Sequence, residues 1–397
     1  MAITTKEEGV WSIDQVYNKQ MQGSIWDYDG LAELYSWGRN SGGQLGLNEQ
    51  HPAGTDSRSS PTQVPGTWTG HFSTGSSGAN AVLYVGKGTD GTLWGWGQNN
   101  SGQLGQNKSG PSAEGYSSPV QIGSDSDWAQ ACIASSSYGV KTDGTLWGWG
   151  FSDNGSTGTG RTAKSSPTQI PGTDYRTTDY SLCAGDQNGW AIRTNGTLWS
   201  WGRNDNGSLG HNNNTSSNYP LQVPGTTWDK LADGASKSMA AIKTNGTLWT
   251  WGYGIAGQLG HNEQTSYSSP KQVPGTTWRS IRMSNSAAWA TKTDGTLWTW
   301  GRNLEGQLGQ GQPTNTYRSS PVQVGSATTW EDKIASSFPS SIMMKKTDGT
   351  LWTWGYNGYG QLGQNSRSNQ PTPQQIPGTL WNSIGGAFSA FYGSQLA

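Results

Sequence analysis

LYSWGRNSGGQLG, residues 34–46, decides the fold, because similar copies open at Leu93, Leu146, Leu198, Leu248, Leu297 and Leu351. The second aromatic residue of each copy is a tryptophan, at positions 37, 96, 149, 201, 251, 300 and 354. Successive tryptophans are 59, 53, 52, 50, 49 and 54 residues apart, the length of a four-stranded propeller blade. The chain lacks the apolar periodicity of helical repeats. The sequence therefore predicts an all-β propeller with seven blades.

Each repeat predicts strands joined by tight turns. Its Leu-Trp-x-Trp-Gly run alternates with a period of two residues, as a buried strand does. The residue before the turn glycine tolerates a positive φ and predicts a two-residue hairpin; it is Asp90, Asp143, Asn195, Asn245, Asp294 or Asp348. A proline suits an outer edge strand; it is Pro61, Pro119, Pro167, Pro220, Pro270, Pro321 or Pro371. An aromatic residue then opens the next blade at Trp68, Trp128, Tyr175, Trp228, Trp278, Trp330 and Trp381.

The number of turns predicts how the ring closes. There are seven Trp-Gly strands but six Asp/Asn-Gly hairpins, and the missing hairpin is the one before Leu34. Residues 381–392, WNSIGGAFSAFY, align with the segment that precedes every other hairpin. We therefore expect the C-terminal strand to pair with the strand at residues 34–38. One blade would then be completed by both chain termini, and no sheet edge would remain open at a break in the ring.

Composition narrows the fold and the partner classes. Among 397 residues there are 59 Gly, with 31% hydrophobic and 13% charged residues, which argues against helical bundles and doubly wound α/β folds. The 23 Trp and 15 Tyr argue against disorder and predict a core built on tryptophan. A net charge of −1 without a basic run predicts no nucleic-acid partner. No apolar run has the length of a membrane span, so we expect no membrane insertion.

The repeat Asp-Gly-x-Leu-Trp-x-Trp-Gly-x-Asn-x-x-Gly-Gln-Leu-Gly resembles that of the regulator-of-chromosome-condensation propellers, over about residues 34–397. The resemblance implies a propeller that binds other proteins through one face. Nucleotide exchange in that family depends on an extra β-hairpin wedge, and chromatin contact depends on a basic tail. Neither feature is found here, so the resemblance does not imply nucleotide exchange.

Residues 1–33 stand outside the repeat and are predicted to form an N-terminal docking arm. The segment KEEGVWSIDQVYNK at 6–19, followed by GSIWDY at 23–28, resembles the N-terminal segment of marine bacteriophage virion proteins. Ser12 and Gln15 fit a capping box, and Gly23 fits a helix stop, so the arm is predicted to hold a short helix. A helix this short needs a docking partner to be stable.

Two interpretations of the arm are open. It folds back on its own propeller, or its apolar side chains bind another virion protein. The residues predicted to make that contact are Trp11, Ile13, Val16, Tyr17, Trp26 and Tyr28.

No pattern of a catalytic, cofactor-binding or metal-binding site is found, and the chain is predicted not to be an enzyme. His211 and His261 share a repeat position one blade apart. Polar turn residues are the favoured interpretation, and a metal pair is the alternative. Cys132 and Cys183 lie at similar positions in successive blades, and buried thiols are favoured over a disulfide.

Binding is the better candidate. The residue after each Trp-Gly is placed by propeller geometry on one rim; these residues are Arg39, Gln98, Phe151, Arg203, Tyr253, Arg302 and Tyr356. Arginine and aromatic residues are enriched where protein surfaces recognise partners, although solvated turn residues are the simpler interpretation. Varied loops before the proline strands carry further candidates at His51, Arg58, Tyr116, Tyr317 and Arg318.

The leading hypothesis from sequence is a non-enzymatic bacteriophage virion protein that displays a propeller as decoration, fibre or tail appendage. Its partners would be other virion proteins through residues 1–33, and a host surface protein or glycan through the propeller. The opening residues MAITTKEEGVW lack the apolar core of a signal peptide, so synthesis in the host cytoplasm and location in the virion are expected. The alternative is a soluble propeller that binds or inhibits another protein.

Overall fold

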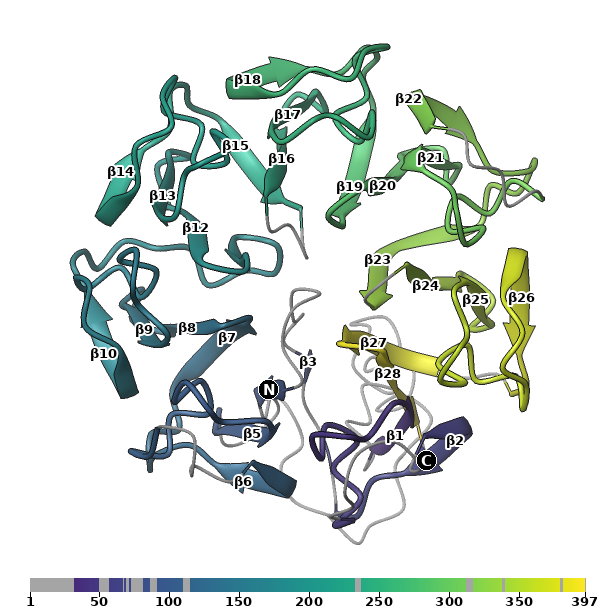
Figure 1. Cartoon of the computed structure of the whole chain (residues 1–397), viewed down its shortest axis with the longest axis horizontal. Coiled ribbons are helices and arrows are strands. Elements are labelled where there is room, and N and C mark those ends of the chain that lie inside the picture. The colour runs from purple at the N-terminus through teal and green to yellow at the C-terminus, as the bar shows by residue number, and fades with distance from the viewer. Residues whose placement is uncertain are drawn as a thin grey trace, which may run out of the picture.

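Seven four-stranded antiparallel sheets surround a central axis as the blades of a propeller (Figure 1). The structure is a computed structural model that describes residues 32–49, 57–66, 68, 71–72, 81–85, 91–109, 115–232, 237–311, 317–337, 340–378 and 381–396. The prediction of a seven-bladed all-β propeller is confirmed. No helix occurs within these ranges, and the predicted arm helix lies outside them.

We number the blades by the order of their Trp-Gly strands. Blade 1 comprises β27 (Trp381–Ala387), β28 (Ala390–Leu396), β1 (Ala32–Gly38) and β2 (Arg58–Gln63). Blade 2 comprises β3 (His71–Phe72), β4 (Ala81–Val85), β5 (Leu93–Gly97) and β6 (Tyr116–Gln121). Blade 3 comprises β7 (Trp128–Ile133), β8 (Ser136–Lys141), β9 (Leu146–Gly150) and β10 (Lys164–Ile170). Blade 4 comprises β11 (Leu182–Ala184), β12 (Asn188–Ile192), β13 (Leu198–Gly202) and β14 (Ser217–Gln222). Blade 5 comprises β15 (Trp228–Leu231), β16 (Ser238–Lys243), β17 (Leu248–Gly252) and β18 (Tyr267–Gln272). Blade 6 comprises β19 (Trp278–Met283), β20 (Ala287–Lys292), β21 (Leu297–Arg302) and β22 (Tyr317–Gln323). Blade 7 comprises β23 (Trp330–Ser337), β24 (Ser341–Lys346), β25 (Leu351–Gly355) and β26 (Gln370–Ile376).

The third strand of each blade is the repeated Leu-Trp-x-Trp-Gly run. In β9, Leu146 and Trp149 are fully buried and Trp147 is half-buried, and the same pattern recurs in the other blades. Proline-bearing strands such as β10 lie at the outer edge of their sheets, as predicted. A proline suits that edge because it leaves no unpaired N–H there.

The five predicted hairpins that lie within the described residues are found where expected, but their loops are longer than predicted; Asp90 of the sixth lies outside these residues. Lys141 N–H donates to the carbonyl of Thr145 and Gly144 N–H donates to that of Lys141, so three residues form the loop. Only the glycine of this loop has a positive φ, +80°, whereas a two-residue type I′ turn needs two such residues. Asp143 instead accepts hydrogen bonds from the N–H and hydroxyl of Thr145 at 2.9 and 2.7 Å. The carboxylate therefore stabilises the turn through its side chain.

A repeated tryptophan hydrogen bond joins every blade to the preceding one. The indole N–H of each second Trp donates to a carbonyl in the turn of the neighbouring blade that is Gly-Gln-Leu-Gly in five blades, Gly-Ser-Thr-Gly in blade 3 and Gly-Ser-Leu-Gly in blade 4, at 2.8–3.1 Å. The pairs are Trp37–Gln361, Trp96–Gln44, Trp149–Gln103, Trp201–Ser156, Trp251–Ser208, Trp300–Gln258 and Trp354–Gln307. These bonds fix the spacing between blades, because all seven tryptophans are fully buried.

Both chain ends complete blade 1, as predicted. β1 pairs antiparallel with β28 from Ala32↔Leu396 to Gly38↔Ala390, without a bulge. β1 begins at Ala32, so this residue and Glu33 belong to the propeller and not to the arm. The final order of the sheet is β2-β1-β28-β27.

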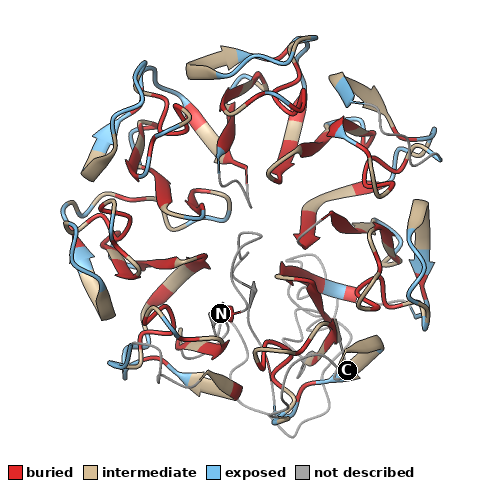
Figure 2. Cartoon of the chain, in the orientation of Figure 1, coloured by how far each residue is buried: buried red, intermediate tan, exposed pale blue. Residues whose placement is uncertain are grey.

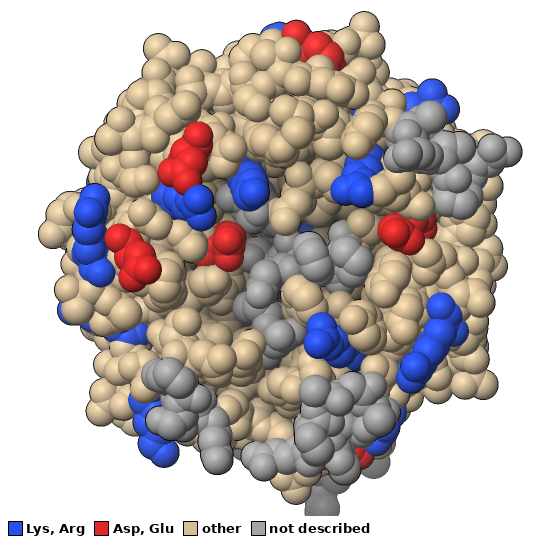
Figure 3. All heavy atoms as spheres, in the orientation of Figure 1, with Lys and Arg blue, Asp and Glu red and all other residues tan. Residues whose placement is uncertain are grey.

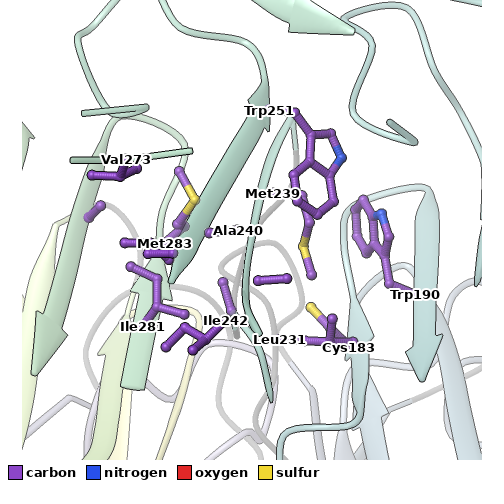
Figure 4. Packing of buried hydrophobic residues seen from close by; sticks show 14 of the residues in the cluster. Cys183, Trp190, Leu231, Met239, Ala240, Ile242, Trp251, Val273, Ile281 and Met283 are labelled. Atoms are coloured by element: carbon purple, nitrogen blue, oxygen red, sulfur yellow. The ribbon is translucent and has the colours of Figure 1, made fainter. Parts of the chain in front are cut away.

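The core is a ring of apolar clusters between neighbouring blades. Buried residues concentrate on the first three strands of each blade, and exposed residues are more frequent on outer strands and loops (Figure 2). Between blades 4, 5 and 6, for example, Trp251, Met239 and Trp190 pack with Leu231, Ile242 and other side chains (Figure 4). Such a ring holds surface loops in fixed relative positions, which suits a binding scaffold.

Candidate protein-binding surface

The predicted rim residues follow the third strands and share one anchoring hydrogen bond. In six blades the backbone N–H of the rim residue donates to a carbonyl in the turn between the first and second strands, at 2.8–3.2 Å. These donors are Arg39, Phe151, Arg203, Tyr253, Arg302 and Tyr356. The six residues therefore lie on one face, which we call the loop face. Arg203 and Arg302 are exposed, and the other four are half-buried.

Blades 7 and 1 bring a cation and three aromatic rings together on the loop face. The Arg39 guanidinium carbon lies 5.0 Å from the ring centre of Tyr359 and 5.5 Å from that of Phe388. Tyr356 meets Tyr359 edge to face at 6.2 Å. Burial raises the pKa of Tyr356, with Tyr359 and Glu305 adding to the rise and Arg39 opposing it. Tyr359 and Phe388 were missed from sequence, although the fourth residue after Trp-Gly could have indicated Tyr359.

Blades 5 and 6 continue this surface with apolar side chains. Ile255 is 54% exposed, and among the described residues the other large aliphatic side chain this accessible is Leu221, at 50%, on the outer strand β14. Lys237 places its ammonium 5.9 Å from the ring centre of Tyr253. Leu304 follows the exposed Arg302 in the next blade. We call the whole surface the basic-aromatic arc: Lys237, Tyr253, Ile255, Arg302, Leu304, Glu305, Tyr356, Tyr359, Arg39 and Phe388.

The opposite half of the loop face is polar and more acidic. Arg203 is paired with Asp205 of its own blade at 2.5 Å. Asn154 donates to the side chain of Gln187 at 2.8 Å. A small hollow here is lined by Asp186, Gln187, Asn188, Arg203, Asp205, Asn206, Ser208 and Lys237. Among the described residues of the face drawn in Figure 3, basic and acidic side chains are interspersed.

At the hairpin end of the blades, cations stack on tryptophans. Lys346 lies 4.8 Å from the ring centre of Trp330 and 3.9 Å from that of Trp352. Lys141, Lys243 and Lys292 likewise lie over two tryptophans each, and Arg193 lies over Tyr175 and Trp199. The cations cover aromatic rings that would otherwise meet water, and the arrangement repeats with the framework. These stacks are therefore structural.

The two repeat histidines bind the framework of their own blades. His211 Nε2 lies 3.0 Å from the Ser200 hydroxyl, and His261 Nε2 lies 2.9 Å from that of Thr250. Burial lowers the pKa of both, and nearby Lys271 lowers that of His261 further, to about 4. Within the described residues no group of three or more His, Cys, Asp and Glu could hold a metal ion.

Burial of the two cysteines is confirmed: Cys132 and Cys183 are buried thiols in adjoining blades.

The other loop candidates do not form one site. Arg58 is paired with Glu49 at 2.6 Å, and Tyr116 is half-buried at the start of β6. Tyr317 and Arg318 are exposed at the start of β22. His51 lies outside the described residues, as do the arm residues Trp11, Ile13, Val16, Tyr17, Trp26 and Tyr28. Among the described residues no helix is long and apolar enough to cross a membrane.

A uniform framework that carries a variable loop face defines this molecule as a repeat propeller scaffold. The family model for the regulator of chromosome condensation (RCC1) repeat matches residues 32–85, 90–138, 195–240, 245–286, 294–336 and 348–388. These matches cover more than half of the chain, and the chain therefore belongs to the RCC1-repeat family. The family model does not match residues 139–194. In this stretch Ser156 and Thr157 replace the usual Gln-Leu, and Tyr175 replaces the Trp that opens the other blades.

This chain matches only part of the length of its relatives. Human E3 ubiquitin-protein ligase HERC2 is 29% identical over 217 residues, which cover 52% of this chain and 4% of the ligase. The zebrafish protein RCC2 homolog is 35% identical over 140 residues, 34% of this chain and 28% of the relative. The ultraviolet-B receptor UVR8 of Arabidopsis thaliana is 29% identical over 200 residues, 50% and 43% of the two chains. The chain thus matches less than half the length of each relative.

Solved structures confirm the fold. Human WBSCR16 is 17% identical with a TM-score of 0.77, over 92% of this chain and 99% of that chain. Prp20p from Saccharomyces cerevisiae is 17% identical with a TM-score of 0.76, over 92% and 91% of the chains. At this identity the likeness concerns architecture alone.

Proposed function

We propose that this chain is a protein-binding propeller that recognises its partner through the loop face. The observation that carries the proposal is the set of arginine and aromatic residues at one repeat position, held on one face of a rigid ring. Membership of the RCC1-repeat family supports it, because the structure of yeast Prp20p was described together with its binding to Gsp1p and histones. A second yeast structure holds RCC1 (Prp20) bound to Kap60. A binding role without catalysis is part of this proposal.

Affinity capture from the source organism tests the proposal. The bait is the full chain, and the comparison bait replaces Arg39, Arg302 and Tyr356 by alanine. We expect the native bait to enrich a defined protein and the variant to lose it, while circular dichroism shows equal folding. Equal capture by both baits, or by neither, would contradict binding through the loop face.

The virion hypothesis remains a prediction about the arm. It rests on the resemblance of residues 6–28, which lie outside the described residues, and neither the RCC1 family nor the relatives above support it. Mass spectrometry of purified phage particles tests it, and absence of this chain from them would refute it.

A further inference from the structure

We propose that the basic-aromatic arc binds a partner segment in which acidic residues flank a large apolar side chain. This inference rests on the proposed protein-binding function and specifies which part of the loop face makes the contact. The arc runs through blades 5, 6, 7 and 1, which are consecutive around the ring (Figure 1).

The apolar side chains of the arc are not required by the repeat. The third residue after Trp-Gly is Ile255 or Leu304 in blades 5 and 6, but Asn100, Asp153 or Asp205 in blades 2, 3 and 4. All these blades have the same four-stranded sheet, so the fold accepts a polar residue at this position. A single exposed aliphatic side chain is common, but Ile255, at 54% exposure, shares its face with Tyr253 and Tyr356, and apolar side chains grouped on one face mark a contact surface. Contact with a partner accounts for it.

The charges of the two halves differ in sign. Lys237 lies at the border of the two halves, where it also lines the polar hollow. Without it, the arc carries Arg302 and Arg39 against Glu305, which gives two cations and one carboxylate. The corresponding turns of blades 3 and 4 carry Asp153, Asp186 and Asp205 against Arg203, which gives three carboxylates and one cation. An acidic segment is therefore attracted to the arc and repelled by the other half.

Arg39 and Arg302 of the arc are available to bind a carboxylate of a partner. Among the described residues neither Arg39 nor Arg302 forms an ion pair, whereas Arg203 is neutralised by Asp205 at 2.5 Å. Stacking on Tyr359 and Phe388 holds the Arg39 guanidinium in place before a partner arrives. A guanidinium restrained in this way loses less conformational entropy when it binds a carboxylate. The aromatic rings beside it supply the apolar contact.

Selection from a displayed library of random peptides tests the inference without knowledge of the natural partner. The full chain is the target, and an enriched peptide is then synthesised and titrated by fluorescence anisotropy. We expect enriched peptides to combine net negative charge with an aromatic residue or leucine. Arg302→Ala and Arg39→Ala should each weaken binding by roughly tenfold.

The matched control is Arg203→Ala, which removes the same side chain at the same repeat position from the other half. We expect it to leave peptide affinity unchanged, and all three variants should keep the native circular dichroism spectrum. The inference is overturned if no peptide is enriched, if enriched peptides lack acidic residues, or if Arg203→Ala weakens binding as much as Arg302→Ala. If the peptide experiments fail in one of these ways but affinity capture still enriches a natural partner, the proposed protein-binding function stands and only the binding role of the arc is refuted.

Discussion

Replacing Trp300 by phenylalanine should destabilise the ring far more than the same change at Trp298, its neighbour but one on β21. The Trp300 indole N–H donates to the carbonyl of Gln258 in blade 5 at 2.8 Å, and the side chain is fully buried. Phenylalanine removes that donor, and a buried carbonyl left without it costs about 1–3 kcal/mol. The lost part of the indole leaves a cavity worth roughly 1 kcal/mol more. The expected loss is therefore about 2–4 kcal/mol.

Trp298 is the matched control because both rings pack edge to face on Trp278, at 6.2 and 5.9 Å. Its N–H bonds only within its own blade, to the Thr296 hydroxyl at 2.9 Å, and the ring is half-buried. Water can replace that contact, so Trp298→Phe should cost only about 0.5–1.5 kcal/mol. Urea unfolding followed by circular dichroism, with midpoints compared at equal slope, measures both. A loss at Trp298 equal to that at Trp300 would refute the role assigned to the bonds between blades.

Two further substitutions test single contacts. The folded pKa of His261, about 4, lies below its ordinary 6.5, so the unfolded chain binds the proton first and stability falls as pH drops from about 6.5 to 4. His261→Gln should reduce the difference in unfolding midpoint between pH 7 and about pH 4.5, because glutamine does not titrate in this range. Glutamine fits this position, since Gln364 makes the equivalent bond to Thr353 in blade 7. An unchanged difference would contradict this. Ser36→Ala removes a buried hydroxyl that donates to the Leu45 carbonyl at 2.8 Å and should cost about 1–2 kcal/mol, and an unaltered urea midpoint would count against it.

The architecture was predictable because the repeat specifies it many times over. The seven tryptophans from Trp37 to Trp354 gave the number of blades, and the missing hairpin before Leu34 gave the closure. The hairpin loop length was wrong because Asp-Gly is compatible with several turns. The choice depends on whether Asp143 bonds Thr145 through its side chain, which the dipeptide does not reveal.

The candidate surface was only half predictable. One repeat position identified Arg39, Arg302 and Tyr356, since geometry places equivalent residues on one face. Phe388 lies 349 positions from Arg39 in the sequence, and the two meet only because β28 pairs with β1. The position of residues from different blades on one surface is a property of the closed ring and cannot be read from any single repeat.

A disulfide between engineered cysteines tests the closure on which the whole account depends. Glu33 and Gln395 are paired across β1 and β28, and both are half-buried, so an oxidant can reach them. Mild oxidation of the Glu33→Cys, Gln395→Cys variant should give an intramolecular link, identified by peptide mapping under non-reducing conditions. The Glu33→Cys, Ser394→Cys variant should not, because adjacent strand residues point to opposite faces. Equal linking in both variants, or links only between separate chains, would contradict a blade shared by the two termini.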